Sequence, residues 1–149
     1  MSALVFRNVD VAPGDPVSDW PLEAIQTALE RGGLEHWRRL ADAIRLEPWG
    51  PVARRLEEVL SYSRPYGVAN ALGRAISRVR SAAEAAERNA VAAEIDRLVR
   101  ASGLSRADFA LRVGTSASRL STYVTGKVTP SAALMVRMRS VANGDQRRR

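Results

Sequence analysis

The sequence predicts an all-α protein in which an N-terminal helical bundle is joined by a long helix to a second, C-terminal helical module. Apolar residues recur every three or four positions from residue 20 onward, and Pro or Gly separates the periodic stretches. Charge divides the chain as well: residues 1–90 contain 12 Arg and 12 acidic residues, whereas residues 91–149 contain 11 basic and 4 acidic ones. The whole net charge of +7 therefore lies in the C-terminal part, which indicates a polyanion-binding module beside a neutral one.

Composition excludes several classes of site. The chain has no Cys and a single His, His36, so disulfides, thiolate metal sites and cysteine nucleophiles are absent. Glu57 and Glu58 are adjacent in a helix and point apart, and no glycine-rich phosphate loop occurs. We therefore expect no enzyme, no metal and no cofactor. The longest bulky apolar run, residues 3–6, is too short for a signal peptide or a membrane span, and we expect a soluble cytoplasmic protein.

Residues 1–19 are predicted to form an extended arm, with Val5, Val9 and Val11 on one side of a short strand. Residues 20–80 are predicted to form an N-terminal helical module for dimerisation or partner binding. Asp19 caps its first helix, which the glycines at 32–33 end. The second helix ends before Pro48, the third begins at Pro51, and a turn at 63–67 precedes the fourth. The inward apolar positions are Leu22, Ile25, Leu29, Trp37, Leu40, Ala41, Ile44, Val52, Leu56, Val59, Leu60, Val68, Leu72, Ile76 and Val79.

A new helix is expected at Ser81, because Ser81 and Glu84 form a capping-box pattern. It runs toward Gly103, and its Ala-rich first part, residues 81–91, is interpreted as a helical connector.

Two short helices joined by a tight turn are predicted after Gly103. Ser105 caps the first, Gly114 supplies the positive φ of the turn, and Ser116 caps the second. Gly126 ends the second helix, and a further helix begins at residues 129–130.

This segment, residues 92–142, resembles the Cro/phage-repressor (Xre-type) helix-turn-helix family. The residues that carry the resemblance are Ile95, Leu98, Gly103, Leu104, Ser105, Phe109, Ala110, Gly114, Leu120, Tyr123, Gly126, Thr129, Pro130, Ser131 and Leu134. Arg106 and Thr115 depart from the family pattern, since Gln and an apolar residue are usual there. The fifth helix common in the family is not expected, because residues 143–149 are a polar, basic tail.

The resemblance implies that the second helix of the motif lies in the DNA major groove. It nominates four residues for contacts with bases: Ala117, Ser118, Arg119 and Thr122. Arg119 can bind guanine, while the others discriminate weakly, so DNA shape is expected to contribute to specificity. Phosphate contacts are expected from Ser105, Arg106, Arg112, Ser116, Ser121 and Lys127.

These expectations favour a sequence-specific transcriptional regulator that binds double-stranded DNA as a homodimer and represses its own gene. Two alternatives stay open. The chain could be an antitoxin whose N-terminal module binds a co-encoded toxin, or an architectural protein with little sequence preference. Trp49 lies in a predicted loop, and Tyr62 and Tyr66 flank Arg64 and Pro65 of the predicted turn. These three aromatic residues are the candidates for contact with a protein partner.

Overall fold

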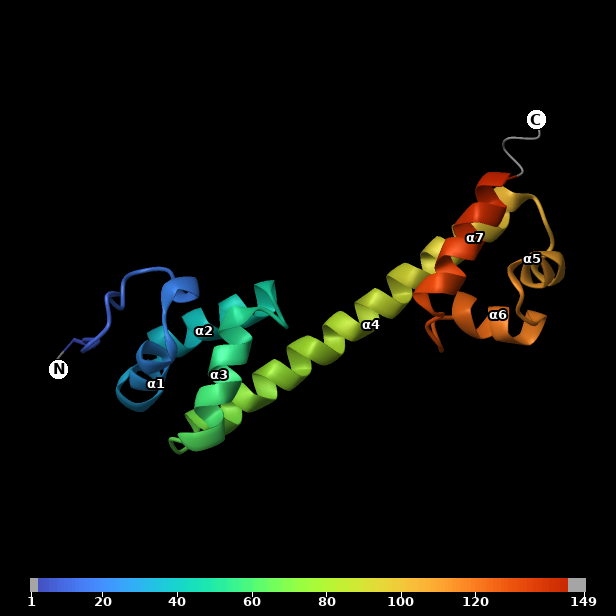
Figure 1. The fold of residues 1–149 in the computed structure, drawn as a ribbon. Helices are drawn as coiled ribbons and strands as arrows, with labels where there is room; N and C mark the ends of the chain where they lie inside the picture. Colours follow the sequence, from blue (N-terminus) through green and yellow to red (C-terminus); the bar gives the residue numbers. More distant parts are fainter. Residues whose placement is uncertain (1–2, 145–149) are drawn as a thin grey trace. The chain divides into compact units, whose positions relative to one another are not determined.

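A computed structural model describes residues 3–144, and these residues form seven α-helices and one 3-10 helix with no strand (Figure 1). The predicted all-α class is confirmed. The elements are η1 (Val17–Asp19), α1 (Leu22–Arg31), α2 (Leu34–Leu46), α3 (Pro51–Tyr62), α4 (Val68–Ser102), α5 (Arg106–Val113), α6 (Ala117–Val124) and α7 (Ala132–Gly144). The chain divides into two compact units, unit 1 (Met1–Ala83) and unit 2 (Glu84–Arg149), and the division falls within α4.

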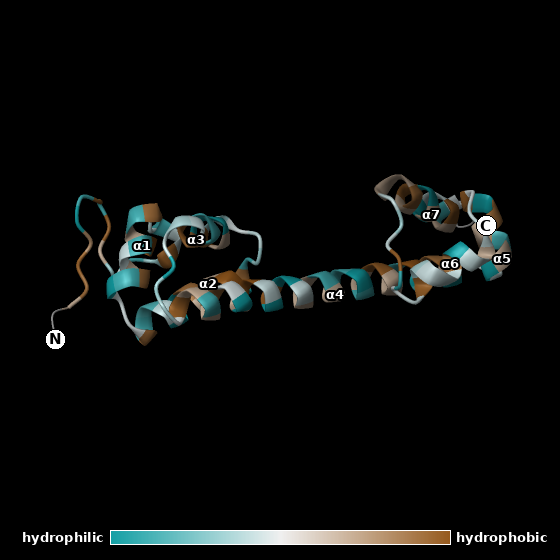
Figure 2. Ribbon diagram, turned by 90° about the horizontal axis from the view of Figure 1, so that it is seen from below, coloured by the Kyte–Doolittle hydropathy of each residue, from teal (hydrophilic) through white to brown (hydrophobic). Residues whose placement is uncertain are grey.

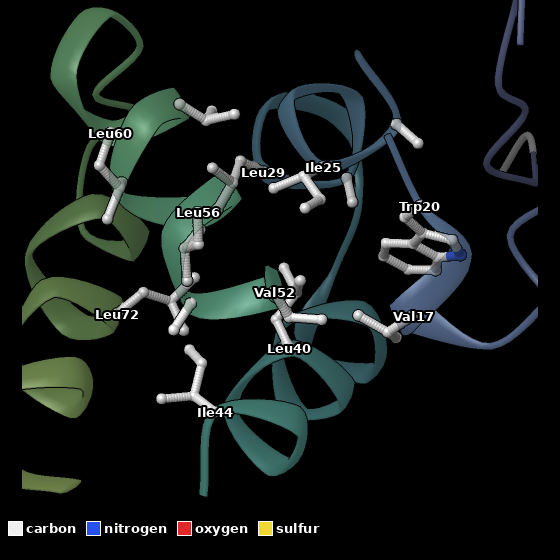
Figure 3. Packing of buried hydrophobic residues seen from close by; sticks show 14 of the residues in the cluster. Val17, Trp20, Ile25, Leu29, Leu40, Ile44, Val52, Leu56, Leu60 and Leu72 are labelled. Carbon is white, nitrogen blue, oxygen red and sulfur yellow. The ribbon is translucent and has the colours of Figure 1, made fainter. Parts of the chain in front are cut away.

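Unit 1 has a core to which η1, α1, α2, α3 and the first part of α4 contribute side chains (Figure 3). The apolar positions predicted from helical periodicity supply most of it. Leu29, Leu40, Leu56 and Val59 are at most 1% exposed. Pro51 begins α3 as expected, because proline has no amide hydrogen to lose in the first turn.

The first residues do not form the predicted strand, since none of residues 3–16 has strand structure. Side-chain contacts hold this segment instead. Phe6 packs edge-on against Trp20, with ring centroids 5.1 Å apart. The Arg39 guanidinium lies 4.9 Å from the centroid of the Trp20 ring and donates hydrogen bonds to the backbone carbonyls of Pro13 and Asp15. An arginine thus satisfies carbonyl groups that a strand would have paired with another strand.

Two predicted helix starts are wrong. Asp19 lies within η1, and α1 begins at Leu22 after Pro21, without a side-chain cap. Ser81 starts no helix, because α4 runs unbroken from Val68 to Ser102. Helix-forming residues flank Ser81 on both sides and neither Gly nor Pro lies nearby after Gly73, so the helix continues through an exposed serine.

The tryptophans have different environments. Trp20 is fully buried. Trp37 is half-buried against the core, and its indole Nε1 donates a 2.9 Å hydrogen bond to the carbonyl of Ala28, which joins α2 to the end of α1. Trp49 is exposed in the loop between α2 and α3.

Unit 2 has a separate core, made by the last part of α4 together with α5, α6 and α7. Its largest fully buried side chains are Phe109, Ile95, Leu120 and Met138. Residues 80–90 of α4 belong to neither core and are mostly exposed. Colouring by hydropathy shows polar and apolar residues mixed along α4 (Figure 2). In the described part of the chain, no helix combines the length and apolar character that crossing a membrane requires.

Candidate nucleic-acid interface

Helix α5 is fixed at its start by a side-chain cap. The Ser105 hydroxyl accepts a 3.1 Å hydrogen bond from the backbone N–H of Asp108, as the sequence predicted. Phe109, Ala110 and Val113 face the core and are at most 1% exposed. The small Ala110 side chain suits the close packing of α5 against its neighbours α6 and α7.

The turn between α5 and α6 has three residues, and its conformation depends on Gly114. Gly114 has φ +84°, in the left-handed region that a side chain disfavours. A Cβ atom at this position would lie 3.1 Å from Nη1 of Arg137. Arg137 extends from α7 and donates a hydrogen bond to the carbonyl of Val113, the last residue of α5. The conformation of the turn therefore depends both on the left-handed backbone of Gly114 and on the hydrogen bond from Arg137 of α7.

Helix α6 begins at a second serine cap, and its exposed face carries hydroxyl groups. The Ser116 hydroxyl accepts from the backbone N–H of Arg119 at 3.1 Å. At about 100° per residue, Leu120 and Tyr123 point to the core, and both are buried. The opposite face presents small side chains: Ala117, Ser118, Ser121, Thr122 and Thr125. Short side chains on this face would allow the helix backbone to approach a binding partner closely.

Some of these hydroxyl groups already have partners within unit 2. The Ser118 hydroxyl lies 3.2 Å from that of Ser116, and the Thr122 hydroxyl donates a 2.6 Å hydrogen bond to the carbonyl of Arg119. Thr122 is also half-buried. The exposed Arg119 guanidinium is, among residues 3–144, not engaged by any of the hydrogen bonds or ion pairs of the structure. Of the four predicted base-contact residues, Arg119 therefore has the most hydrogen-bonding capacity left.

The chain around α6 is uniformly basic. Residues 109–144 contain five basic residues and no Asp or Glu. Arg112, Arg119 and Lys127 among them are exposed. Arg106 is exposed too, but it lies 3.9 Å from the Asp96 carboxylate, which partly offsets its charge. Ser121, another predicted phosphate contact, is exposed on α6.

Two arginines of α7, Arg137 and Arg139, are exposed and yet have partners within unit 2. Besides the Arg137 contact with Val113, Nε of Arg139 donates a 2.8 Å hydrogen bond to Oε1 of Glu94 on α4. This hydrogen bond lowers the pKa of the Glu94 carboxyl and raises the pKa of Arg139. The sequence alone did not indicate either contact, since the partners are 24 and 45 residues apart.

The loop from α6 to α7 packs on the last part of α4. A Cβ atom at Gly126 would lie 3.4 Å from Oδ1 of Asn89 and 3.7 Å from Cβ of Ala92. Pro130 is buried, and the Ser131 hydroxyl accepts from the N–H of Leu134. Helix α7 therefore begins at Ala132, two residues later than predicted, and extends to Gly144. The rest of the predicted tail, residues 145–149, lies outside the described residues.

The three candidate partner contacts of unit 1 are exposed. Trp49 is 43% exposed and Tyr62 56%, while Tyr66, in the turn between α3 and α4, is fully exposed. Among the described residues, no group of three His, Asp or Glu side chains is arranged to hold a metal ion.

No family model, no curated protein and no solved structure matches this chain. The geometry of α5, the turn and α6 is therefore the basis on which a function is proposed.

Proposed function

We propose that unit 2 binds double-stranded DNA through α5 and α6 and that the chain is a sequence-specific transcriptional regulator. The observation that carries the proposal is the three-residue turn at Gly114 between two serine-capped helices, with a hydroxyl-rich, acid-free face on the second helix. Two short helices in this relation are the arrangement of helix-turn-helix DNA-binding proteins, and the resemblance to the Xre-type family points the same way.

In this proposal α6 enters the major groove. Arg119 donates to O6 and N7 of a guanine, and the methyl groups of Ala117 and Thr122 contact thymine. Ser105, Arg106, Arg112, Ser116, Ser121 and Lys127 bind phosphates on both sides of the groove. The small number of specific side chains supports binding as a homodimer, because two-fold symmetry doubles the contacts on half-sites roughly 34–36 Å apart. A regulator of this kind acts in the cytoplasm, where we place the chain.

The test is a fluorescence anisotropy titration of the full chain with DNA from upstream of its own gene and with a shuffled copy, across a salt series. Binding to the native fragment that is tighter by about a hundredfold or more would support an autorepressor. Equal, steeply salt-dependent binding to both fragments would support an architectural role. Absence of binding to either fragment at low salt would refute the proposal.

A second candidate function is an antitoxin, favoured by the exposure of Trp49, Tyr62 and Tyr66 in a unit distinct from the proposed DNA surface. Tyrosine and tryptophan are enriched at the centres of protein interfaces. If the gene has a neighbour that encodes a toxin, its product should co-purify with the chain, and Tyr66→Ala should weaken the complex without changing DNA affinity. A solitary gene, or a complex that forms equally well with Tyr66→Ala, would count against this function.

A further inference from the structure

A groove of about 310 Å³ lies between α3 and α4 in unit 1. Its apolar lining is Leu60 and Ile76, which are 6% and 5% exposed. Polar groups surround it: Glu57, Ser61, Arg64, Ser77 and Arg80. The volume is at the lower end of the range for sites that bind small organic molecules.

Gly73 lines this groove from the second turn of α4. Within a helix, glycine is the least favourable residue apart from proline. Packing gives no reason for it here, because a Cβ atom at Gly73 would meet no other atom within 4 Å. The missing side chain instead leaves space in the groove. Gly73 therefore costs helix stability without relieving a clash in the chain's own fold, and it leaves the groove open at this point.

The charges of the groove favour an anion. Arg80 forms an ion pair with the Glu57 carboxylate, so the charges of Arg80 and Glu57 offset each other. Arg80 also donates a hydrogen bond to the carbonyl of Pro48. Arg64 donates to two neutral acceptors, the carbonyl of Leu60 at 3.3 Å and Oδ1 of Asn70 at 3.1 Å. Among the described residues, no ion pair joins Arg64 to a carboxylate, and its two hydrogen bonds use two of the five N–H groups of the guanidinium.

The hydroxyl groups differ in availability. The Ser61 hydroxyl donates to the carbonyl of Glu58, whereas Ser77, one turn after Gly73 on α4, can donate into the groove. A carboxylate beside Arg64 would receive a charge-assisted hydrogen bond, and Ser77 lines the same groove with a neutral donor. Leu60 and Ile76 would then contact an apolar body attached to the carboxylate.

We propose that this groove binds a small organic anion, a carboxylate carried on an apolar body. The site lies wholly in unit 1 and is independent of DNA binding by unit 2, so it can be tested in the absence of DNA. Two probes with the same apolar body and opposite charge, 4-phenylbutyrate and 4-phenylbutylamine, separate the contribution of charge from that of the apolar lining.

The experiment titrates each probe into the ¹⁵N-labelled full chain and follows the amide resonances of Gly73 and Ser77. The carboxylate should give saturable shifts with a Kd on the order of 1 mM, which is ordinary for a ligand of this size. The amine should not saturate. Arg64→Ala should weaken carboxylate binding by about fivefold, whereas Arg74→Ala, an exposed α4 arginine that does not line the groove, should leave it unchanged.

Substitutions of Gly73 provide the decisive comparison, since they should improve folding. Gly73→Ala should raise the Tm of unit 1 by about 4 °C, because alanine favours the helix and meets no neighbour. Gly73→Leu should fill the groove and weaken the carboxylate probe by at least about tenfold while the unit stays folded. The proposal is overturned if the carboxylate gives no saturable shift, if the amine binds equally well, or if Gly73→Leu leaves the Kd unchanged.

Discussion

Nη1 of Arg137 donates a 3.0 Å hydrogen bond to the backbone carbonyl of Val113. This contact joins α7 to the end of α5, where the last carbonyl groups of a helix lack partners within it. The next residue is Gly114, and the guanidinium occupies space next to its Cα. The turn that orients α6 is therefore determined by α7 as well as by its own sequence.

Gly114→Ala is expected to destabilise unit 2 by more than the approximately 1–2 kcal/mol that a side chain costs in the left-handed region, since the new methyl group would also crowd Arg137. Gly103→Ala is the matched control, because Gly103 has φ +71° and open space where its Cβ would lie. Urea denaturation followed by far-UV circular dichroism measures both. If both variants lose the same free energy of unfolding, crowding against Arg137 does not contribute to the effect of Gly114→Ala.

Ser81→Ala should leave the protein as stable as before or raise its stability by about 0.5 kcal/mol, because alanine is the better residue inside a helix. Were Ser81 a helix cap, the same change would cost about 1 kcal/mol. Ser116→Ala, at a serine that does cap a helix, should show that loss. Urea denaturation of both variants, measured side by side, gives the two changes in the free energy of unfolding. A loss at Ser81 equal to that at Ser116 would contradict a continuous α4.

The Glu94–Arg139 pair predicts a pH dependence. Its hydrogen bond lowers the pKa of Glu94 in the folded state below the ordinary value of 4.5. The carboxylate therefore stabilises unit 2 above pH 4.5, and this stabilisation is lost as the pH falls through the lower, folded-state pKa. Glu94→Gln should reduce the Tm slightly at neutral pH, with a difference from the parent that vanishes in acid. The pair is exposed, so the effect is small. A Tm difference between the two proteins that increases as the pH falls would contradict stabilisation by the Glu94 carboxylate.

Arg39→Met should destabilise unit 1 by about 2 kcal/mol, because it removes charged hydrogen bonds to the carbonyls of Pro13 and Asp15. The neighbouring Arg38 is exposed, and Arg38→Met should have little effect. All three tryptophans lie in unit 1, so tryptophan fluorescence during urea denaturation measures this unit selectively. If the two variants unfold at the same urea concentration, the hydrogen bonds from Arg39 to residues 3–16 do not stabilise unit 1.

For DNA binding, Arg119→Ala should lower affinity for the native fragment by about tenfold or more and reduce its preference over shuffled DNA, as expected for a lost guanine contact. Lys127→Ala should weaken binding to both fragments equally and reduce the salt slope by about 1. Arg54→Ala removes the same charge from unit 1 and is the control. Anisotropy titrations measure all three. An Arg119→Ala effect no larger than that of Arg54→Ala would reject α6 as the recognition helix.

Local sequence patterns predicted the turn around Gly114 well. Ser105 and Ser116 cap the helices that they were expected to cap, and Gly114 has the expected positive φ. Each of these features depends on residues within three or four positions of one another. The same kind of pattern failed at Ser81, since a serine followed three residues later by Glu also fits the exposed side of a continuous helix.

Contacts between distant residues could not be read from the sequence. Arg39 is 24 residues from Asp15, and Arg137 is 24 residues from Val113. An arginine in a helical pattern is expected to face solvent, and nothing nearby in the sequence indicates which carbonyl it reaches. The groove at Gly73 could not be predicted either, because it is lined by residues of both α3 and α4, which are distant in the sequence.

Lys127 is the sole lysine among the 149 residues, and it is exposed in the loop that follows α6. Apart from His36, every other basic side chain is an arginine guanidinium, which amine-directed reagents do not modify. An acylating reagent consequently has one side-chain amine to modify, and it lies on the surface that we propose contacts phosphates. Mass-spectrometric measurement of acylation at this side-chain amine would therefore report how far a polyanion covers that surface, without tags or mutations in the chain.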